Sequence, residues 1–405
     1  MPTLLQINVT SNWGSHGKIA ENIGRLAMDR GWKSVIAYGR HSNPSKNETI
    51  QIGSTFSVNE HVLENRLFDN HGLASRIATN QFTQRIDQLK PNLVHLHNIH
   101  GYYLNYKRLF EYLAETNVPV VWTFHDCWPF TGHCAYFDYV GCDRWKTECK
   151  APCPCKGDYP KSLLFEATNR NYNLKKESFN SLKNLTIVPV SEWLGRLLSE
   201  SFLKDYPVYV IKNGIDINTF KPISSEIVRE KYGIGQHPYV IGVASVWDRR
   251  KGFDDFVKLR KLLSGNVSIV LVGLDEKKLA TAQKNGIVGI PRTENVSELV
   301  ALYSDAIAFL NLTYEDNYPT TNLEAMSCGT PVLTYRTGGS PEAVTDETGW
   351  VIEKGDIESV LEITRCLRER VDVMRDACRK RAEEHFDKNK CFQKYVDLYE
   401  SLMQK

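Results

Sequence analysis

Residues 311–344, NLTYEDNYPTTNLEAMSCGTPVLTYRTGGSPEAV, predict a strand end, a loop, a short helix, a strand, a second loop and a helix start. The turn-rich residues 317–322 suit the beginning of the short helix, with Pro or Thr in its first turn. A helix that begins there presents unpaired backbone N–H groups and the positive end of its dipole, which favour a phosphate. Asp316 and Glu324 lie eight residues apart around this helix start. A carboxylate at Glu324 can accept hydrogen bonds from sugar hydroxyls, so the pattern indicates a nucleotide sugar.

The order of residues in this stretch resembles the acidic signature of retaining GT-B-type glycosyltransferases of the glycogen synthase and mannosyltransferase-like group. In that group a Glu-Gly-Phe-Gly-type loop is followed by a second Glu, by Ala-Met-Ala-x-Gly-x-Pro-Val and by a Gly-Gly turn. The matching residues here are Glu324-Ala325-Met326, Gly329, Pro331-Val332 and Gly338-Gly339. The chain departs from the group at Asp316, which replaces the first Glu, and at residues 317–319, Asn-Tyr-Pro in place of Gly-Phe-Gly.

The resemblance implies roles for donor-binding residues in the second half of the chain. Glu324 is expected to bind the ribose. Asp316, which shares a loop with the donor-binding candidate Asn317, is expected to bind the hydroxyls of the donor sugar. The backbone amides of Asn322 and Leu323 are expected to bind the phosphates. Lys251, together with Arg249 or Arg250, is expected to neutralise the leaving diphosphate. The backbone of Ile290 and Pro291 is expected to bind the nucleotide base.

The beginning of the chain predicts a strand at residues 3–9, a loop at 10–17 and a helix at 18–30. A strand, a glycine-bearing loop and a helix open a Rossmann-like unit. The resemblance implies that Gly14 and Gly17 face the donor phosphates. The adjacent Gly-Gly pair typical of the group is absent, and a plain turn is the alternative interpretation.

A strand predicted at residues 118–124 ends at His125-Asp126. The resemblance places His125 against the donor sugar near the reaction centre, with Asp126 orienting His125 or the acceptor; a purely structural histidine is the alternative. Residues 98–102 follow the preceding strand and are expected to line a ligand-binding edge. His95 and His97 within that strand are predicted to pack in the core rather than to bind a metal.

Six of the ten cysteines lie between Cys127 and Cys155. In a reducing compartment such clustering favours a metal over disulfides. The predicted ligands of a structural zinc are Cys134, Cys142, Cys149 and Cys153, with Cys155 as a fifth candidate. The spacing matches no zinc-finger pattern, and free thiols or disulfides are the alternatives. The segment resembles an insertion in some bacterial capsule and exopolysaccharide glycosyltransferases and is expected to border the acceptor site.

The composition is that of a globular protein large enough for two domains, with 405 residues, 42% hydrophobic and 24% charged. A net charge of +2 argues against a general nucleic-acid binder. We expect neither a signal peptide nor a transmembrane helix, hence a cytoplasmic protein that is at most peripheral on the cytoplasmic face of a membrane. Residues 159–182 predict one long helix, by default a solvated face and otherwise a membrane-surface candidate. Its cations are Lys161, Arg170, Lys175 and Lys176, with Lys183 just beyond it.

Together these features predict an α/β, GT-B-like fold with two facing Rossmann-like domains, residues 1–205 and 206–385, and a C-terminal helix, 386–405, that packs on the first. The expected reaction is retaining transfer of a sugar from a nucleotide-diphosphate sugar, UDP before GDP, to a glycan or lipid-linked saccharide. No cofactor or catalytic metal is expected. The alternatives are an epimerase or phosphorylase of the same fold, or a non-catalytic scaffold that binds a partner through the cysteine segment.

Overall fold

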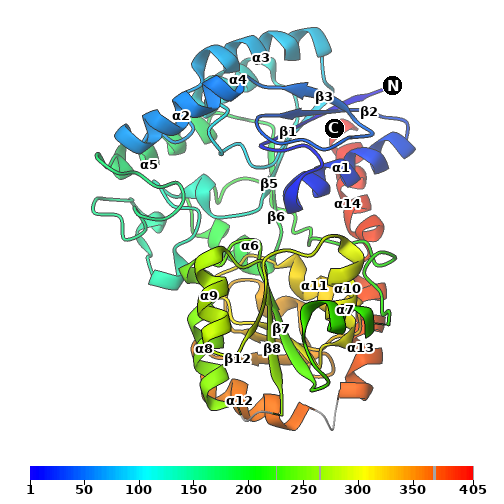
Figure 1. Cartoon of the computed structure of the whole chain (residues 1–405). Coiled ribbons are helices and arrows are strands. Elements are labelled where there is room, and N and C mark those ends of the chain that lie inside the picture. Colours follow the sequence, from blue (N-terminus) through cyan, green and yellow to red (C-terminus); the bar gives the residue numbers. More distant parts are fainter. Residues whose placement is uncertain (225, 264–265, 368–370, 405) are drawn as a thin grey trace. The chain divides into compact units, whose positions relative to one another are not determined.

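The structure, a computed structural model, describes residues 1–224, 226–263, 266–367 and 371–404. The chain forms two compact units (Figure 1). The first unit contains Met1–Lys212 and Cys391–Lys405, and the second contains Asn213–Lys390. The sequence interpretation placed these boundaries at residues 205 and 386. Each unit is described by itself.

The first unit is built on a parallel six-stranded sheet in the order β3-β2-β1-β4-β5-β6. All its strands except the exposed edge strand β3 (ETIQ) are short apolar runs, and the central ones are buried at nearly every position, as expected for a parallel sheet covered on both faces. The strands are β1 (Thr3–Asn8), β2 (Lys33–Tyr38), β3 (Glu48–Gln51), β4 (Leu93–Leu96), β5 (Val120–Phe124) and β6 (Leu185–Pro189).

The helices of the first unit are α1 (Gly14–Asp29), α2 (Thr55–Phe68), α3 (Arg76–Leu89), α4 (Tyr106–Thr116), α5 (Thr168–Phe179), α6 (Glu192–Ser199) and most of α14 (Lys388–Met403). Helix α14 buries Phe392, Tyr395 and Tyr399 in one hydrophobic cluster with residues of α1 and β5. The C-terminal helix therefore belongs to the core of the first unit, which confirms the prediction that it packs there.

The second unit repeats this topology in the order β12-β11-β10-β7-β8-β9. Its strands are β7 (Tyr239–Val243), β8 (Ser268–Val272), β9 (Val288–Ile290), β10 (Ala308–Asn311), β11 (Val332–Tyr335) and β12 (Gly349–Ile352). Its helices are α7 (Glu226–Tyr232), α8 (Phe253–Leu262), α9 (Glu276–Lys284), α10 (Val296–Asp305), α11 (Thr320–Ser327), α12 (Ile357–Cys366) and α13 (Val371–His385). Two doubly wound parallel sheets confirm the predicted α/β fold with two Rossmann-like domains.

The single helix predicted over residues 159–182 is wrong. Only α5 is helical, and the chain before it lies against the C-terminal end of α2, where the Leu163 N–H donates to the Arg66 carbonyl at 2.8 Å. Lys175 is buried and donates to the carbonyls of Trp128 (2.7 Å) and Thr131 (3.0 Å). Because this ammonium group is used inside the unit, Lys175 does not contribute to a basic surface.

Candidate functional site

The strand order of the second unit reverses between β7 and β10, and open α/β sheets bind ligands at the carboxyl ends of the strands at such a point. Lys251 follows β7 in a 3₁₀ turn (Arg249–Lys251), and Asp316 follows β10. The two side chains form an ion pair, with 2.5 Å between Lys251 Nζ and Asp316 Oδ2. Gly252 permits this approach: its φ is +70°, and a Cβ there would lie 2.0 Å from the Leu312 carbonyl oxygen.

The loop after β11 supports Asp316 from behind. The Gly339 N–H donates to the Asp316 carbonyl at 3.1 Å, and a Cβ on Gly338 would lie 1.8 Å from that oxygen. The Asn317 N–H donates to Asp316 Oδ1 at 2.9 Å. Burial raises the pKa of Asp316, but the charges of Lys251 and Arg250 outweigh this effect and leave the pKa below its usual value. The carboxylate is therefore ionised and fixed in orientation at neutral pH.

The two arginines that the sequence left as alternatives differ in their surroundings. Arg250 is half-buried, donates to the Glu315 carbonyl at 2.6 Å and lies 3.5 Å from a carboxylate oxygen of Asp248. Arg249 is exposed. Arg250 is thus the arginine fixed beside the Asp316 loop.

Helix α11 begins at Thr320, directly after Pro319. The Asn322 N–H donates to the Pro319 carbonyl at 3.1 Å, and its side chain bridges Asn311 (2.7 Å) and the Ser340 carbonyl (3.3 Å). Leu323 is buried. The N–H groups of Thr320 and Thr321 precede Asn322 and have no carbonyl one turn earlier within the helix. These two residues belong to the helix start that the sequence predicted, and their N–H groups are candidates for binding an anion beside the predicted amides of Asn322 and Leu323.

Glu324 lies half-buried on α11, where it accepts a hydrogen bond from the Tyr303 hydroxyl of α10 at 3.3 Å. Burial raises the pKa of Tyr303, and the Glu324 charge adds to this effect. Tyr303 therefore stays protonated and donates to the carboxylate. The sequence held no signal for this pair, because the two residues come from different helices.

The predicted base-binding residues lie at the end of the edge strand β9. The Ile290 carbonyl accepts the Gly273 N–H at 2.8 Å, and Pro291 is exposed. The same carbonyl also accepts the Leu274 N–H at 3.4 Å, so both of its lone pairs have partners within the unit.

In the first unit, histidines lie at the carboxyl ends of the sheet strands. His125, directly after β5, bonds His97 (Nε2 to Nδ1, 3.2 Å), and His97 Nε2 bonds Gln6 Oε1 at 3.0 Å. Because the Gln6 oxygen accepts, His97 carries its proton at Nε2, and its Nδ1 accepts a hydrogen bond from the Nε2–H of His125. Burial is the main cause that lowers the pKa of both rings, and neighbouring histidines lower it further. Both imidazoles are thus neutral at pH 7.

Asp126 follows His125 in the chain, and its negative charge raises the pKa of His125, although burial prevails. It accepts from His100 Nε2 at 2.8 Å and from the Trp128 N–H at 2.9 Å. His100 Nδ1 in turn bonds the hydroxyl of Tyr159 at 2.8 Å. Burial raises the pKa of Asp126, yet the interaction with His100 prevails and lowers it overall. Asp126 therefore connects the sheet edge to the cysteine segment through His100.

Gly14 and Gly17 lie in the first turn of α1 rather than in the preceding loop. A Cβ on Gly17 would lie 2.7 Å from Thr10 Oγ1, so glycine is required there for packing. His95 is buried and bonds Thr123 (2.8 Å) and Tyr399 (2.6 Å), which accords with its predicted core position.

The cysteine segment encloses a small cavity. The four thiols Cys134, Cys142, Cys149 and Cys153 line it together with His133 and Trp145, whereas Cys155 is not among its lining residues. All ten cysteines of the chain, each within the described residues, are free of disulfides. In the described part of the chain no three His, Cys, Asp or Glu side chains are arranged as metal ligands. The zinc site therefore stays a prediction.

Two doubly wound sheets, the second with cations and carboxylates at its switch point, define the class of GT-B glycosyltransferases. The profile of the Glycosyltransferase Family 4 domain matches residues 17–219, and that of Glycosyl transferases group 1 matches residues 224–385. The chain belongs to glycosyltransferase family 4.

Known relatives resemble the chain over much of its length. A protein described as the colanic acid biosynthesis glycosyl transferase WcaC of Escherichia coli K12 is 24% identical over 89% of this chain and 90% of its own. The N,N'-diacetylbacillosaminyl-diphospho-undecaprenol alpha-1,3-N-acetylgalactosaminyltransferase of Campylobacter jejuni is 24% identical over 57% of this chain and 66% of its own.

Two solved structures share the fold over nearly the whole chain. Sucrose-phosphate synthase from Thermosynechococcus elongatus has a TM-score of 0.75 at 15% identity, with full coverage of both chains. Anabaena HepE in complex with UDP has a TM-score of 0.68 at 15% identity and covers 99% of this chain and 100% of its own.

Proposed function

We propose that this protein transfers a sugar, with retention of anomeric configuration, from a nucleotide-diphosphate sugar to a lipid-linked or glycan acceptor. The observation that carries the proposal is the Lys251–Asp316 pair at the switch point, beside Arg250 and the N-terminus of α11. UDP is favoured as the nucleotide, since HepE, which shares the fold, was solved with UDP. The names of the WcaC and Campylobacter relatives support a polysaccharide or undecaprenol-linked acceptor.

The proposed chemistry follows from the charges of the second unit. As the bond between the anomeric carbon and the diphosphate oxygen breaks, negative charge grows on the leaving phosphate, and Lys251 and Arg250 stabilise it. Asp316 accepts hydrogen bonds from hydroxyls of the donor sugar, and Glu324 from those of the ribose. The acceptor oxygen forms the new bond, and its proton passes to the departing phosphate. Residues of this chain thereby supply all the charge stabilisation, and no catalytic metal is required.

Turnover of a panel of UDP- and GDP-sugars tests this function. The wild-type chain should release nucleotide from at least one donor, and Glu324→Ala should weaken donor binding about 10- to 100-fold, the range for a hydrogen bond to a charged group. Glu347→Ala, a carboxylate on the exposed surface of the same unit, is the matched control and should leave turnover unchanged. Equal turnover by wild type and Glu324→Ala would contradict the proposal.

We also propose a structural zinc ion in the cysteine segment, residues 127–160. Its support is that the four predicted thiols, drawn from one loop-rich segment, line the same small cavity. Binding requires these side chains to rotate toward a common centre, since they are not yet arranged as ligands.

A further inference from the structure

The first unit exposes an unusual number of large apolar side chains around α2. They are Phe56, Leu63 and Phe68 of α2, Ile77 of α3, and Leu163, Leu164 and Phe165 of the segment before α5, each between 48% and 79% exposed. We call these seven residues the apolar face. Single exposed apolar residues are ordinary, but a group of this size on adjacent elements marks an interaction surface.

The apolar face extends from one end of α2 to the other, with the exposed Glu60 between Phe56 and Leu63. Phe56 and Leu63 are seven residues apart and so share one side of the helix. The rings of Phe68 and Phe165 stack at 5.9 Å between centroids. At the other end of the helix, Phe56 and Ile77 line one groove between α2 and α3.

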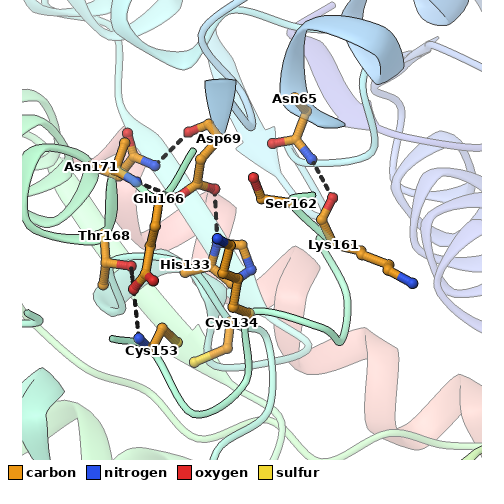
Figure 2. Close-up of polar contacts among 12 residues, drawn as sticks. Asn65, Asp69, His133, Cys134, Cys153, Lys161, Ser162, Glu166, Thr168 and Asn171 are labelled. Carbon is orange, nitrogen blue, oxygen red and sulfur yellow. Dashed lines mark hydrogen bonds and ion pairs between the residues drawn. The ribbon is translucent and has the colours of Figure 1, made fainter. Parts of the chain in front are cut away.

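The segment that carries residues 163–165 is fixed in this exposed position by its backbone. The Leu163 and Phe165 N–H groups donate to the carbonyls of Arg66 (2.8 Å) and Leu67 (3.1 Å) at the end of α2. Asn65 donates to the Lys161 carbonyl at 3.2 Å (Figure 2). These bonds hold the segment against the helix while its apolar side chains point outward, so the exposure does not result from a loose loop.

A second set of contacts holds the start of α5 in the interior of the unit. Asp69, fully buried, accepts the Ala167 N–H at 2.8 Å and His133 Nδ1 at 2.7 Å, and its carbonyl accepts from Asn171 at 2.7 Å (Figure 2). The exposed segment thus lies between two sets of hydrogen bonds, one to α2 and one to the buried Asp69.

A cationic groove borders the apolar face. Its charged lining residues are Arg76, Lys107, Arg108 and Arg170, against the single carboxylate Glu111. Arg76 directly precedes Ile77 of the apolar face, and Arg170 donates to Asn70, two residues beyond Phe68, at 2.5 Å. Of the other carboxylates near the apolar face, Glu64 and Glu166 are hydrogen-bonded to neighbouring groups, and Glu60 is exposed.

From this arrangement we infer that the apolar face and the cationic groove dock the first unit on the surface of an anionic lipid bilayer. Phe and Leu side chains that project beside arginines suit the interface, where apolar side chains enter the acyl boundary and cations meet lipid phosphates. None of the helices in the described residues has the length and apolarity that a bilayer crossing requires. The inference concerns residues other than those of the proposed donor site.

Co-sedimentation of the full chain with vesicles tests the inference. Vesicles of phosphatidylcholine with one quarter phosphatidylglycerol should bind the protein, and pure phosphatidylcholine vesicles should bind it at least tenfold more weakly. Binding to the anionic vesicles should fall at high salt, because salt screens the cationic groove. No binding to anionic vesicles, or equal binding to both compositions, would overturn the inference.

Two matched variants separate the apolar face from general surface effects. The double variant Leu164→Glu/Phe165→Glu should lose at least tenfold in vesicle binding. The control Ile227→Glu/Val373→Glu, which changes residues 83% and 80% exposed in the second unit, should bind as wild type. Both variants should keep the thermal shift caused by UDP, which tests folding and the donor site independently. Unchanged vesicle binding by the first variant would refute the bilayer as the partner. So would a wild-type chain that binds no vesicles and forms a dimer that the first variant, but not the control, dissociates.

Discussion

The two units share one strand order but differ in the chemistry of their strand ends. The second unit places an ion pair, Lys251–Asp316, and the half-buried Arg250 at its switch point. The first unit places the neutral His125–His97–Gln6 chain at the corresponding edge. Nine of the eleven histidines, all within the described residues, lie in the first unit, and both histidines of the second unit are exposed.

This difference shows that one fold supports two kinds of site. Paired charges close to a helix N-terminus suit a diphosphate, whose charge grows as the glycosidic bond breaks. Neutral imidazoles and amides present directional donors and acceptors, and the carboxylate beside them, Asp126, is paired with His100, so this edge suits uncharged sugar hydroxyls. The predictions below test this division, beginning with the largest expected effect.

Removing the cation of the second unit should have the largest effect. Lys251→Ala leaves Asp316 without its ion-pair partner and the leaving diphosphate without one cation, so turnover should fall about 10²- to 10³-fold. Lys258→Ala, on the neighbouring helix α8, is the matched control and should retain turnover. A Lys251→Ala enzyme within threefold of wild type would show that the ion pair is structural only.

The histidines of the first unit should make the protein sensitive to acid. His61 Nε2 accepts the Gly72 N–H at 3.0 Å, and burial lowers the pKa of His61 to about 3. The unfolded chain therefore binds a proton below pH 6.5 that the folded chain does not bind until pH approaches 3. Stability is full above pH 6.5 and decreases as the pH falls, by about 2 kcal/mol from this residue at pH 5.

Urea unfolding at pH 7.5 and pH 5 measures this effect. The loss in free energy of unfolding between the two pH values should be about 2 kcal/mol smaller in His61→Gln than in wild type. The exposed His385→Gln should lose as much as wild type. An identical pH dependence in all three proteins would argue against a neutral, buried His61.

Substitution of His125 should have a smaller effect and should separate the two sites. His125→Ala removes one hydrogen-bonding ring, which costs about tenfold in turnover. The thermal shift caused by UDP should not change, because the proposed nucleotide site lies in the second unit. A loss of UDP binding in this variant would mean that the two edges do not divide the substrates as proposed.

The zinc ion should affect stability but not nucleotide binding. Metal analysis of the purified chain should find one zinc per molecule, and Cys149→Ser should lose it, whereas Cys378→Ser outside the segment should keep it. UDP should shift the melting temperature equally in both variants. A wild-type chain without zinc, after expression in zinc-containing medium, would remove the metal site from the account.

What the sequence predicted well was local. Most strands followed from apolar runs, whereas the exposed edge strand β3 has none and was not predicted. The Asp316–Glu324 region followed from an ordered motif within one short stretch. The Asp126–His100 and Glu324–Tyr303 contacts join residues far apart in the chain, so no local pattern indicated them. The false helix over residues 159–182 has the same cause, because carbonyls of α2 hold its first part in a loop.

Hydrogen exchange of the full chain with and without UDP tests most directly whether the charged edge of the second unit binds the nucleotide. We expect UDP to slow exchange in residues 248–252 and 314–324, and we expect Lys251→Ala to weaken this protection. Saturating UDP that protects neither segment, or that protects only residues of the first unit, would contradict the assignment of the donor site.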